Sequence, residues 1–337
     1  MAPEFHASRD RIDEFASDLA ALEPRNPFRT PQYAQAMRSL GKVPWVFFTR
    51  EGGNIVAGCI GFVQSGRLNR LLELPSIPPV GRTDPFWHGL RAFCRGERIS
   101  QLSLQSFGSS GGGIAEIEGE TERRSRVEYV LELQGTALWS NVSSNHRRNM
   151  QKGQKAGLLV ERTFATEACE MHARLQDASM ERRANRGEQV QADAQVRSFA
   201  ALLKTGAGEI FRATSGSEIL SSILVLRAEK GAYYHSAGTR PEGMAVGASH
   251  FLIRSVAEML RAESMEVFNL GAAGASNPGL ERFKTGFGPK AVNLEAATFD
   301  FANPLQKIVG SVFGLLRRIS SANQPVHKPD SEAERSS

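Results

Sequence analysis

The chain has 337 residues and a mass of 36.8 kDa, which is enough for about two domains of average size. Hydrophobic residues make up 41% and charged residues 23%, a mixture that excludes a wholly disordered or collagen-like chain. The 41 Lys and Arg residues against 36 Asp and Glu give a net charge of +5, which permits anionic partners without requiring nucleic acid. The three cysteines, Cys59, Cys94 and Cys169, lie far apart, which excludes a disulfide scaffold and a cysteine-based zinc site.

The sequence carries no recognisable targeting or membrane-spanning segment. Residues 1–19 contain charges throughout and lack a continuous apolar stretch, so we expect no secretory signal. No stretch approaches the roughly 18 apolar residues that span a bilayer, so we expect no integral membrane segment. The expected location is the cytoplasm, with the inner face of the membrane as a place of peripheral contact.

The first part of the chain mixes helices and strands. Residues 26–41 predict a helix with Thr30 as its N-cap, Pro31 in its first turn and Gly41 after its end. The Gly/Ser-rich stretch 106–113 predicts a loop. The other predicted elements are two strands over 44–66, a strand that enters a proline-rich loop over 67–85, a helix over 86–97, and strands over 98–107 and 127–133.

The composition turns polar and basic near residue 140, and we place a domain boundary there. The predicted domains are 1–139 and 140–302, followed by an amphipathic helix at 303–320 and a disordered tail at 321–337. The predicted elements of the second domain are a helix over 143–157, a strand over 157–164, helices over 166–184 (N-cap Thr166) and 196–208, an antiparallel meander of three strands over 209–238, a helix over 247–263, a strand over 265–271, a helix over 277–288 and a strand over 291–301.

This order of elements resembles the fold of the GNAT N-acyltransferases. Four segments resemble, more specifically, the acyltransferase domain of FemAB-like peptidoglycan-bridge enzymes and their polysaccharide-cluster relatives: SSNHRRNMQKGQKAGL (143–158), GAYYHSAG (231–238), the stretch 240–260, and FNLG followed by GLERFKTGFG (268–271 and 279–288). The resemblance implies a mixed α/β fold with an α+β mixed sheet, in two tandem GNAT-like domains of which the first is degenerate. It also implies an acyltransferase without a permanently bound cofactor, and we expect no metal.

The predicted helix 143–157 carries a basic stripe. Arg148, Lys152 and Lys155 are spaced i, i+4, i+7 and share one face, and Arg147 borders it. An arginine guanidinium can donate two parallel hydrogen bonds to a phosphate, and a lysine ammonium adds a compact positive charge. Arg147, Arg148 and Lys152 are therefore predicted to bind the anionic end of a donor or acceptor. The alternative is an ordinary solvated helix face.

The loop RPEGMAVGAS (240–249) precedes an amphipathic helix. In a GNAT fold, the backbone N–H groups of this loop and the helix N-terminus hold the pyrophosphate of an acyl carrier. The pattern [RQ]xxGx[GA] of coenzyme A users fits here, although about one match is expected by chance. FemAB-like enzymes use aminoacyl-tRNA and do not need the loop in this form. The predicted carrier-binding residues are Arg240, Gly243, Ala245, Gly247, Ala248 and Ser249.

Lys284 and His235 are the predicted catalytic residues. Lys284 lies between Phe283 and Phe287, where a partly buried ammonium could neutralise the oxyanion of acyl transfer. The resemblance implies the same role for the lysine of this motif; the alternative is a surface lysine that extends past an aromatic pair. His235 has an ordinary pKa suited to a base, and its alternative is a structural role.

Strand alternation places Tyr233 and His235 on one face and Tyr234 and Ser236 on the other. A tyrosine could reprotonate the leaving group, and Tyr234, Phe283 and Phe287 are predicted to contact substrate. The sequence shows no Ser-His-Asp or Cys-His arrangement with a recognisable spacing. We therefore expect direct acyl transfer without a covalent enzyme intermediate.

The predicted function is transfer of an acyl group from acyl-coenzyme A to an amine of a cell-envelope or exopolysaccharide precursor, which is a small or lipid-linked molecule. The alternatives are an aminoacyl-tRNA-dependent FemAB-type enzyme acting on a peptidoglycan precursor, and a non-catalytic membrane-associated scaffold. The small net positive charge of the chain favours acyl-coenzyme A over aminoacyl-tRNA as the donor, because tRNA needs a broad basic surface. The apolar face of residues 303–320 is typical of a helix that lies in a membrane interface or docks on the second domain. The sequence leaves the oligomeric state open.

Overall fold

The computed structural model describes residues 3–66, 69–135, 138–187, 195–273 and 277–302. The predicted helix 303–320 and tail 321–337 lie outside the described residues. Within the described ranges, no helix is long and apolar enough to cross a bilayer.

The first half of the chain builds one end of the fold. Its elements are β1 (Glu4–Ser8), α1 (Ile12–Leu22), a 3-10 turn (Pro27–Arg29), α2 (Pro31–Ser39), β2 (Val43–Glu51), β3 (Asn54–Ser65), β4 (Arg70–Leu74), α3 (Pro85–Gly96) and β5 (Gln101–Leu104). The predicted helix at 26–41 is confirmed as α2, because the side chain of Thr30 accepts a hydrogen bond from the Tyr33 backbone N–H. Asp84 caps α3 in the same way. The sequence pattern predicts neither β1 nor α1.

The second half follows the predicted order of elements and adds the short helix α7. Its elements are β6 (Glu120–Glu132), α4 (Ser144–Lys155), β7 (Leu159–Thr163), α5 (Ala168–Ala184), α6 (Val196–Lys204), β8 (Gly208–Ser215), β9 (Glu218–Arg227), β10 (Gly231–Thr239), α7 (Pro241–Ala245), α8 (Ala248–Ala262), β11 (Val267–Ala272), α9 (Pro278–Thr285) and β12 (Lys290–Asp300). Ser143 caps α4, because its side chain accepts a hydrogen bond from the His146 backbone N–H. The prediction of Thr166 as the cap of α5 is wrong: Glu167 holds that position without a side-chain hydrogen bond.

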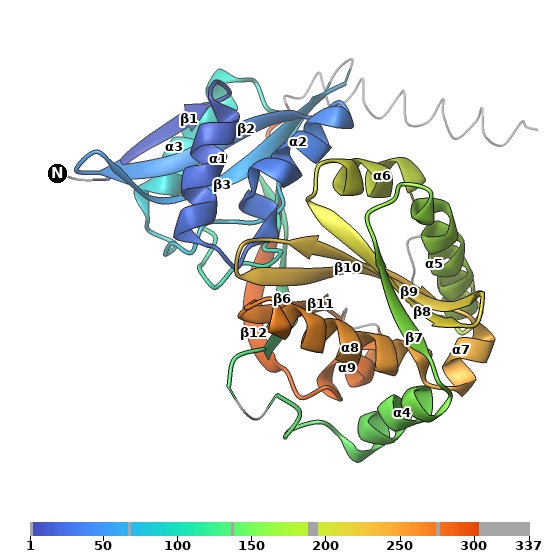
Figure 1. Cartoon of the computed structure of the whole chain (residues 1–337). Coiled ribbons are helices and arrows are strands. Elements are labelled where there is room, and N and C mark those ends of the chain that lie inside the picture. The colour runs from blue at the N-terminus through green and yellow to red at the C-terminus, as the bar shows by residue number, and fades with distance from the viewer. Residues whose placement is uncertain (1–2, 67–68, 136–137, 188–194, 274–276, 303–337) are drawn as a thin grey trace, which may run out of the picture.

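The described strands form one mixed sheet of 12, in the order β1-β2-β3-β4-β5-β12-β6-β11-β10-β9-β8-β7 (Figure 1). Strand β12 joins the halves, because it pairs with β5 on one side and β6 on the other. Strands β8, β9 and β10 form the predicted antiparallel meander. The predicted mixed α/β class is thereby confirmed, and the sheet consists of two parts that meet at β12. The boundary near residue 140 stays a prediction, and β6, which precedes it, pairs with β12 and β11.

Helices cover both faces of this sheet. On one face, α1 and α2 share a core with α5 and α6 that contains Phe28, Tyr33, Phe199 and Tyr233. On the opposite face, the core under α3 is separate from the core under α4 and α8. The shared core places α2 against α6, so the two halves pack directly on each other (Figure 1).

Strands β10 and β11 run parallel and pair only at their starts, from Gly231 opposite Val267 to Tyr233 opposite Asn269. Beyond this point the register of β10 against β9 shifts between Tyr234 and Ser236, which is a β-bulge. The bulge bends β10 away from β11. The two strands therefore separate, and the backbone between them opens into a cavity.

Candidate active site

Three cavities lie next to one another where β10 leaves β11. The central one, of about 470 Å³, is lined by Lys284, Tyr234 and His235 among others. It shares His235 with a cavity of about 660 Å³ between α2 and α6. On its other side it shares Tyr234 with a cavity of about 240 Å³ bounded by α5 and α8. The structure thus brings both predicted catalytic residues to one cavity that is reached from two sides.

Lys284 is a buried lysine, with 5% of the residue exposed. Its Nζ donates a hydrogen bond to the Ala272 carbonyl oxygen at 2.7 Å and lies 5.5 Å from the centre of the Tyr234 ring. Desolvation by burial lowers the pKa of Lys284 to about 7, against the opposing attraction of the Glu128 carboxylate. A lysine in a cavity that titrates near neutral pH is a strong candidate for chemistry.

Glu128, on β6, is a fully buried carboxylate that the sequence analysis did not single out. Its Oε1 accepts hydrogen bonds from the Tyr233 hydroxyl at 2.7 Å and from Arg126 Nη2 at 2.8 Å. Its Oε2 accepts from Asn269 Nδ2 at 2.7 Å and from the Gly108 backbone N–H at 3.0 Å. This network ties β6, β10 and β11 together where the strands separate. The available signal was a carboxylate between Val127 and Tyr129 in the predicted strand 127–133.

The Tyr233 hydroxyl and Lys284 Nζ approach the same point of the backbone. Gly271 has a φ of +71°, and a Cβ there would lie 3.2 Å from the hydroxyl and 3.4 Å from Nζ. The hydroxyl of Tyr233 donates to Glu128, and burial raises its pKa well above the usual value. Tyr233 therefore stays protonated, and its hydrogen bond to Glu128 fixes its side chain beside Lys284.

His235 occupies the bulge, and its ring opens into the central cavity and the larger one. His235 is exposed to the cavities, and desolvation by the surrounding protein still lowers its pKa to about 4, so the imidazole is neutral at pH 7. The predicted position of Ser236 on the opposite face is wrong. Ser236 Oγ lies 2.8 Å from His172 Nε2, and both His172 and His235 contact the Phe199 ring. The bulge adds one residue, so Ser236 faces the same side as His235.

His146, in the segment 143–158, contacts the segment 279–288, so two of the segments that carry the family resemblance meet. Its Nε2 lies 2.8 Å from the Phe283 carbonyl oxygen, and its ring packs edge-on against Phe287 with centroids 4.7 Å apart. A Cβ at Gly286 would overlap the His146 ring, which explains the glycine in RFKTGFG. Phe287 is 0% exposed, so the predicted substrate contact is corrected to a packing role. Phe283 lines the 240 Å³ cavity and stays a candidate contact.

The predicted carrier loop reaches the 240 Å³ cavity at Ser249, near the start of α8. Gly247 has a φ of +74°, and a Cβ there would overlap the Asn149 carbonyl, so this glycine allows α4 to pack closely. Gly243 is buried against Leu220 in the same manner. Of the remaining predicted residues, Ala248 is fully buried, Ala245 is exposed, and the Arg240 backbone N–H donates to the Leu220 carbonyl at 2.9 Å.

Arg147, Arg148 and Lys152 are exposed on α4, and none of them lines the three cavities. The guanidinium groups at the 240 Å³ cavity come from the end of α5 and just beyond it, a set the sequence analysis did not single out: Arg182, Arg183 and Arg186. Arg182 donates to the Thr239 carbonyl oxygen and to Ser179 Oγ. The charged run at 181–186 was the available signal.

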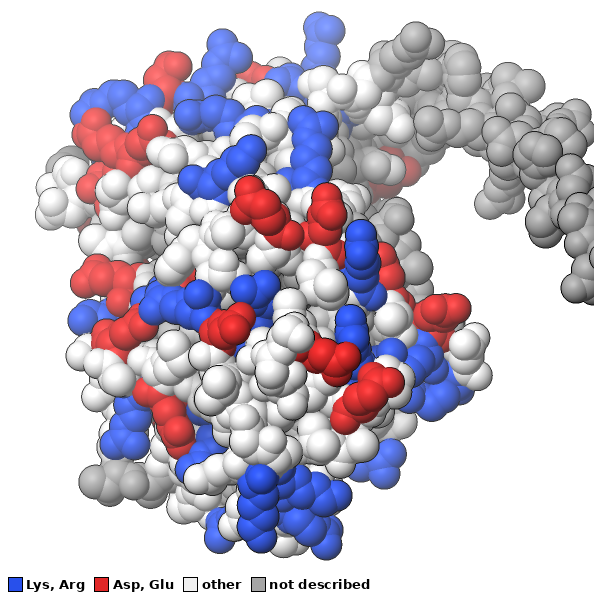
Figure 2. Space-filling view, turned by 45° about the vertical axis from the view of Figure 1, so that its right-hand side comes forward, with Lys and Arg blue, Asp and Glu red and all other residues white. Residues whose placement is uncertain are grey.

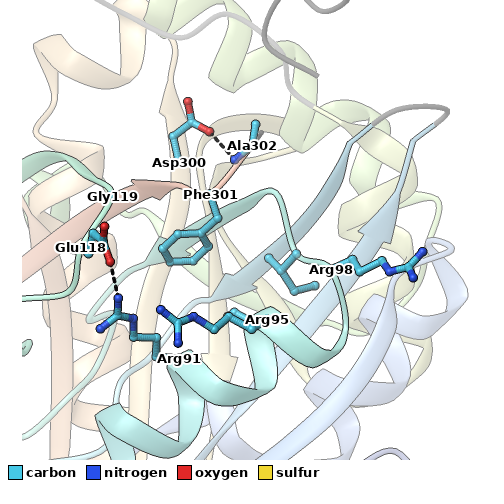
Figure 3. Close-up of a pocket in the computed structure, with 10 residues that line it drawn as sticks. Arg91, Arg95, Arg98, Glu118, Gly119, Asp300, Phe301 and Ala302 are labelled. Carbon is cyan, nitrogen blue, oxygen red and sulfur yellow. Dashed lines mark hydrogen bonds and ion pairs between the residues drawn. The ribbon is translucent and has the colours of Figure 1, made fainter. Parts of the chain in front are cut away.

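A fourth cavity, of about 600 Å³, lies apart from the others and shares no lining residue with them. Arg91 and Arg95 lie near Phe301 there, Arg98 points away from it, and Arg91 pairs with Glu118 (Figure 3). In the described ranges, no group of three or more His, Cys, Asp and Glu side chains is placed to hold a metal ion.

Comparisons with known proteins agree with this geometry. Residues 140–285 match the family model of the acetyltransferase (GNAT) domain. No curated protein matches the chain. Among solved structures, FemX superposes with a TM-score of 0.61 at 12% identity, covering 91% of this chain and 99% of FemX.

Two further solved structures share the fold. The C-terminal domain of a putative lysylphosphatidylglycerol synthetase from Agrobacterium fabrum superposes with a TM-score of 0.51 at 15% identity, covering 92% of this chain and 98% of that domain. A conserved protein of unknown function from Bacteroides thetaiotaomicron VPI-5482 gives 0.55 at 10% identity, covering 87% of this chain and 97% of the other. Residues 140–285 are therefore similar to the acetyltransferase (GNAT) domain, and the chain shares the overall fold of FemX.

Proposed function

We propose that this acyltransferase moves an acyl group from acyl-coenzyme A to a primary amine of an anionic cell-envelope or exopolysaccharide precursor. The observation that carries the proposal is Lys284, a buried amine with a pKa of about 7 at the point where β10 and β11 separate. No permanently bound cofactor is required, because the coenzyme is a co-substrate.

The reaction needs positioning and charge stabilisation. The amine nitrogen attacks the thioester carbonyl carbon, a C–N bond forms, and the carbonyl oxygen takes up negative charge next to the Lys284 ammonium. Neutral His235 accepts the proton that the attacking nitrogen loses. The C–S bond then breaks, and the departing thiolate recovers the proton. No covalent enzyme intermediate is needed.

The 240 Å³ cavity suits the donor. Ser249 lies in the first turn of α8, where backbone N–H groups favour anions, and Arg182 and Arg186 line the same cavity. Phosphates held there would direct the acyl thioester past Tyr234 toward Lys284. Among the predicted carrier-loop residues, Arg240, Gly243, Ala245, Gly247 and Ala248 would then act through the backbone or through packing.

The 660 Å³ cavity suits the acceptor. Gln64 and Gln176 offer amide groups for a hydroxyl-rich molecule, and Gln176 Oε1 is buried without a hydrogen-bond partner within the described part of the chain. Arg197 adds positive charge to this cavity, and Lys42 lines it while its ammonium is paired with Glu73 at 2.8 Å. The name of the Agrobacterium neighbour denotes a phospholipid product, which supports a lipid-linked acceptor at the inner membrane face.

The second candidate is an aminoacyl-tRNA-dependent transfer to a peptidoglycan precursor. The superposition with FemX over 91% of the chain favours it, because FemAB-like enzymes use that donor. The non-catalytic scaffold receives no support from these findings, because the chain carries an acyltransferase domain.

A donor screen tests the proposal. The pure protein is incubated with radiolabelled acetyl-coenzyme A or charged tRNA and a panel of amines, and thiol release and labelled amide are measured. We expect amine-dependent thiol release that Lys284→Met slows about 10²- to 10³-fold. The exposed control Lys290→Met, which removes a lysine at the start of β12, should retain it.

Three results would contradict parts of this scheme. Transfer from charged tRNA alone identifies the second candidate. Transfer that survives Lys284→Met overturns the assigned role of Lys284. Consumption of neither donor overturns both candidates.

A further inference from the structure

Glu73, on β4, brings a carboxylate into the central cavity of the candidate active site. It is the only carboxylate among the described residues that line this cavity, whereas three cations line it: Arg126, Arg183 and Lys284. The described residues that line the two neighbouring cavities include cations and no carboxylate. The outer surface differs, because acidic and basic side chains are interspersed over most of the face shown in Figure 2. Glu73 is therefore the one lining group that can attract a cation into these cavities.

The position of Glu73 is fixed by the sheet and by Lys42. Strand β4 is paired with β3 on one side and β5 on the other, and the neighbouring side chains of Leu72 and Leu74 are fully buried. Lys42 Nζ lies 2.8 Å from Glu73 Oε2. Lys42 lines the 660 Å³ cavity and Glu73 lines the central one, so the ion pair spans the boundary between them.

The second carboxylate oxygen of Glu73 remains available. Within the described part of the chain, Oε1 accepts no hydrogen bond, and 30% of the side chain is exposed. A carboxylate offers about four acceptor positions on its two oxygens, and Lys42 occupies one of them. A donor that enters the central cavity can therefore bind Glu73 without displacing Lys42.

Aromatic rings form the wall that leads from Glu73 toward Lys284. Phe28 packs edge-on against Tyr33, with ring centroids 5.1 Å apart, and against Tyr233, with centroids 5.0 Å apart. All three rings line the central cavity. Burial and, to a smaller extent, the nearby Glu73 carboxylate raise the pKa of Tyr33, so this end of the row lies next to Glu73. A carboxylate beside aromatic rings is a combination that binds an alkylammonium group.

We propose that Glu73 binds the ammonium group of the acceptor and directs its nitrogen into the central cavity toward Lys284. A primary amine is a cation at pH 7, and the lysine and arginines of this cavity repel it, so a carboxylate is required to admit it. The assignment rests on the proposed amine acceptor and holds for either donor. Glu73 is a recognition residue in this scheme, and the proton transfer to His235 is unchanged. The first half of the chain thereby selects the acceptor.

Acceptor kinetics test the role of Glu73. The primary-amine probes are ethanolamine, D-glucosamine and L-lysine, which are mostly protonated at pH 7, and the neutral probe is hydroxylamine. The donor is the one that the wild type consumes, and the uncatalysed rate is subtracted. In Glu73→Gln we expect the KM of the best primary amine to rise about 10- to 100-fold with kcat nearly unchanged, because a charge-assisted hydrogen bond is lost. The kcat/KM for hydroxylamine should stay unchanged, and Glu73→Asp should show a smaller rise in KM.

Lys42→Met should have the opposite effect. It removes the cation that competes for the carboxylate, so the KM of the primary amine should fall severalfold. A purely structural ion pair would instead make the two variants behave alike. Glu97→Gln is the matched control, because Glu97 pairs with Arg70 at 2.8 Å, is 35% exposed and lines none of the three cavities. The thermal unfolding midpoint confirms that each variant is folded.

The outcomes separate this assignment from the proposed function. If the wild type acylates a primary amine and Glu73→Gln leaves its KM unchanged, the role of Glu73 is overturned and the proposed function stands. An equal loss with hydroxylamine, an equal rise in Glu97→Gln, or a rise of KM in Lys42→Met would overturn the role as well. A wild type that acylates no amine from either donor overturns the proposed function itself.

Discussion

The Nε2 atom of His146 lies 2.8 Å from the carbonyl oxygen of Phe283, the residue before Lys284. This contact links α4 to α9, although 137 residues separate the two positions along the chain. The His146 ring is held in turn by Ser143 Oγ at 3.0 Å and by the Phe287 ring. The position of the lysine at the cavity thus depends on a histidine in a different segment of the sequence.

Gly286→Ala should disturb this link. The added Cβ would overlap the His146 ring, so we expect a loss of unfolding free energy of about 1–3 kcal/mol and reduced turnover. Urea unfolding monitored by fluorescence measures the first effect. Gly279→Ala is the matched control, because it lies on the same helix with no atom within 4 Å of the added Cβ. Equal stability of the two variants would show that the ring contact does not constrain α9.

Lys284→Met should separate activity from stability. The folded state resists protonation of this amine, because burial lowers its pKa from 10.5 to about 7. Below pH 7 the folded protein therefore carries the full penalty of a buried charge, and the penalty disappears as the pH rises toward 10.5.

At pH 6 we expect Lys284→Met to raise the unfolding free energy by about 1–4 kcal/mol while turnover falls about 10²- to 10³-fold. Calorimetry and the thiol-release assay measure the two effects. A variant that is less stable than the wild type at pH 6 would contradict the assigned burial penalty.

The pH profile of kcat/KM should fall above about pH 7, because the oxyanion requires the ammonium form of Lys284. It should also fall below about pH 4, where His235 becomes protonated and can no longer accept a proton. The ionisation of the acceptor amine is measured separately and subtracted. Lys284→Arg, which stays charged, should remove the alkaline decline. A profile that rises through pH 7 would instead identify Lys284 as the base.

Glu128→Gln should weaken the strand junction. The carboxylate accepts hydrogen bonds from four groups, and an amide brings a donor against them, so we expect a loss of about 2–4 kcal/mol. The alkaline decline of kcat/KM should also move to lower pH, because Glu128 raises the pKa of Lys284. Glu122→Gln, at an exposed position of the same strand, is the control. An unshifted decline would show that Glu128 does not influence the lysine.

His172 should make the protein sensitive to acid. Burial lowers its pKa from 6.5 to about 3, and both ring nitrogens lie 2.8 Å from serine hydroxyls, those of Ser222 and Ser236. The unfolded chain binds a proton in this range that the folded protein excludes, so stability is lost as the pH falls from 6.5 to 3.

The slope of unfolding free energy against pH is proportional to the number of protons that the chain takes up on unfolding. His172→Asn should reduce that number in this pH range by up to about one. Urea unfolding at several pH values measures the slope, and His88→Asn at an exposed position serves as the control. An unchanged slope in His172→Asn would show that other groups carry the acid sensitivity.

The sequence by itself determined the features that depend on neighbours a few residues apart. The cap of α2 by Thr30, the meander at 209–238 and the order of elements in the second half follow from short-range hydrogen bonding and from periodicity. The family resemblance also lies in contiguous segments, so it was visible without the fold.

Only the tertiary structure decided which of these segments meet, because pairing between distant strands and helices has no local signal. The bulge at His235 turned Ser236 to the other face, and the packing of α4 directed Arg148 and Lys152 to the surface. The sequence motif identified Lys284 as a candidate, but its pKa near neutrality comes from burial between elements that are far apart in sequence. Desolvation is a property of the assembled site, and a sequence does not display it.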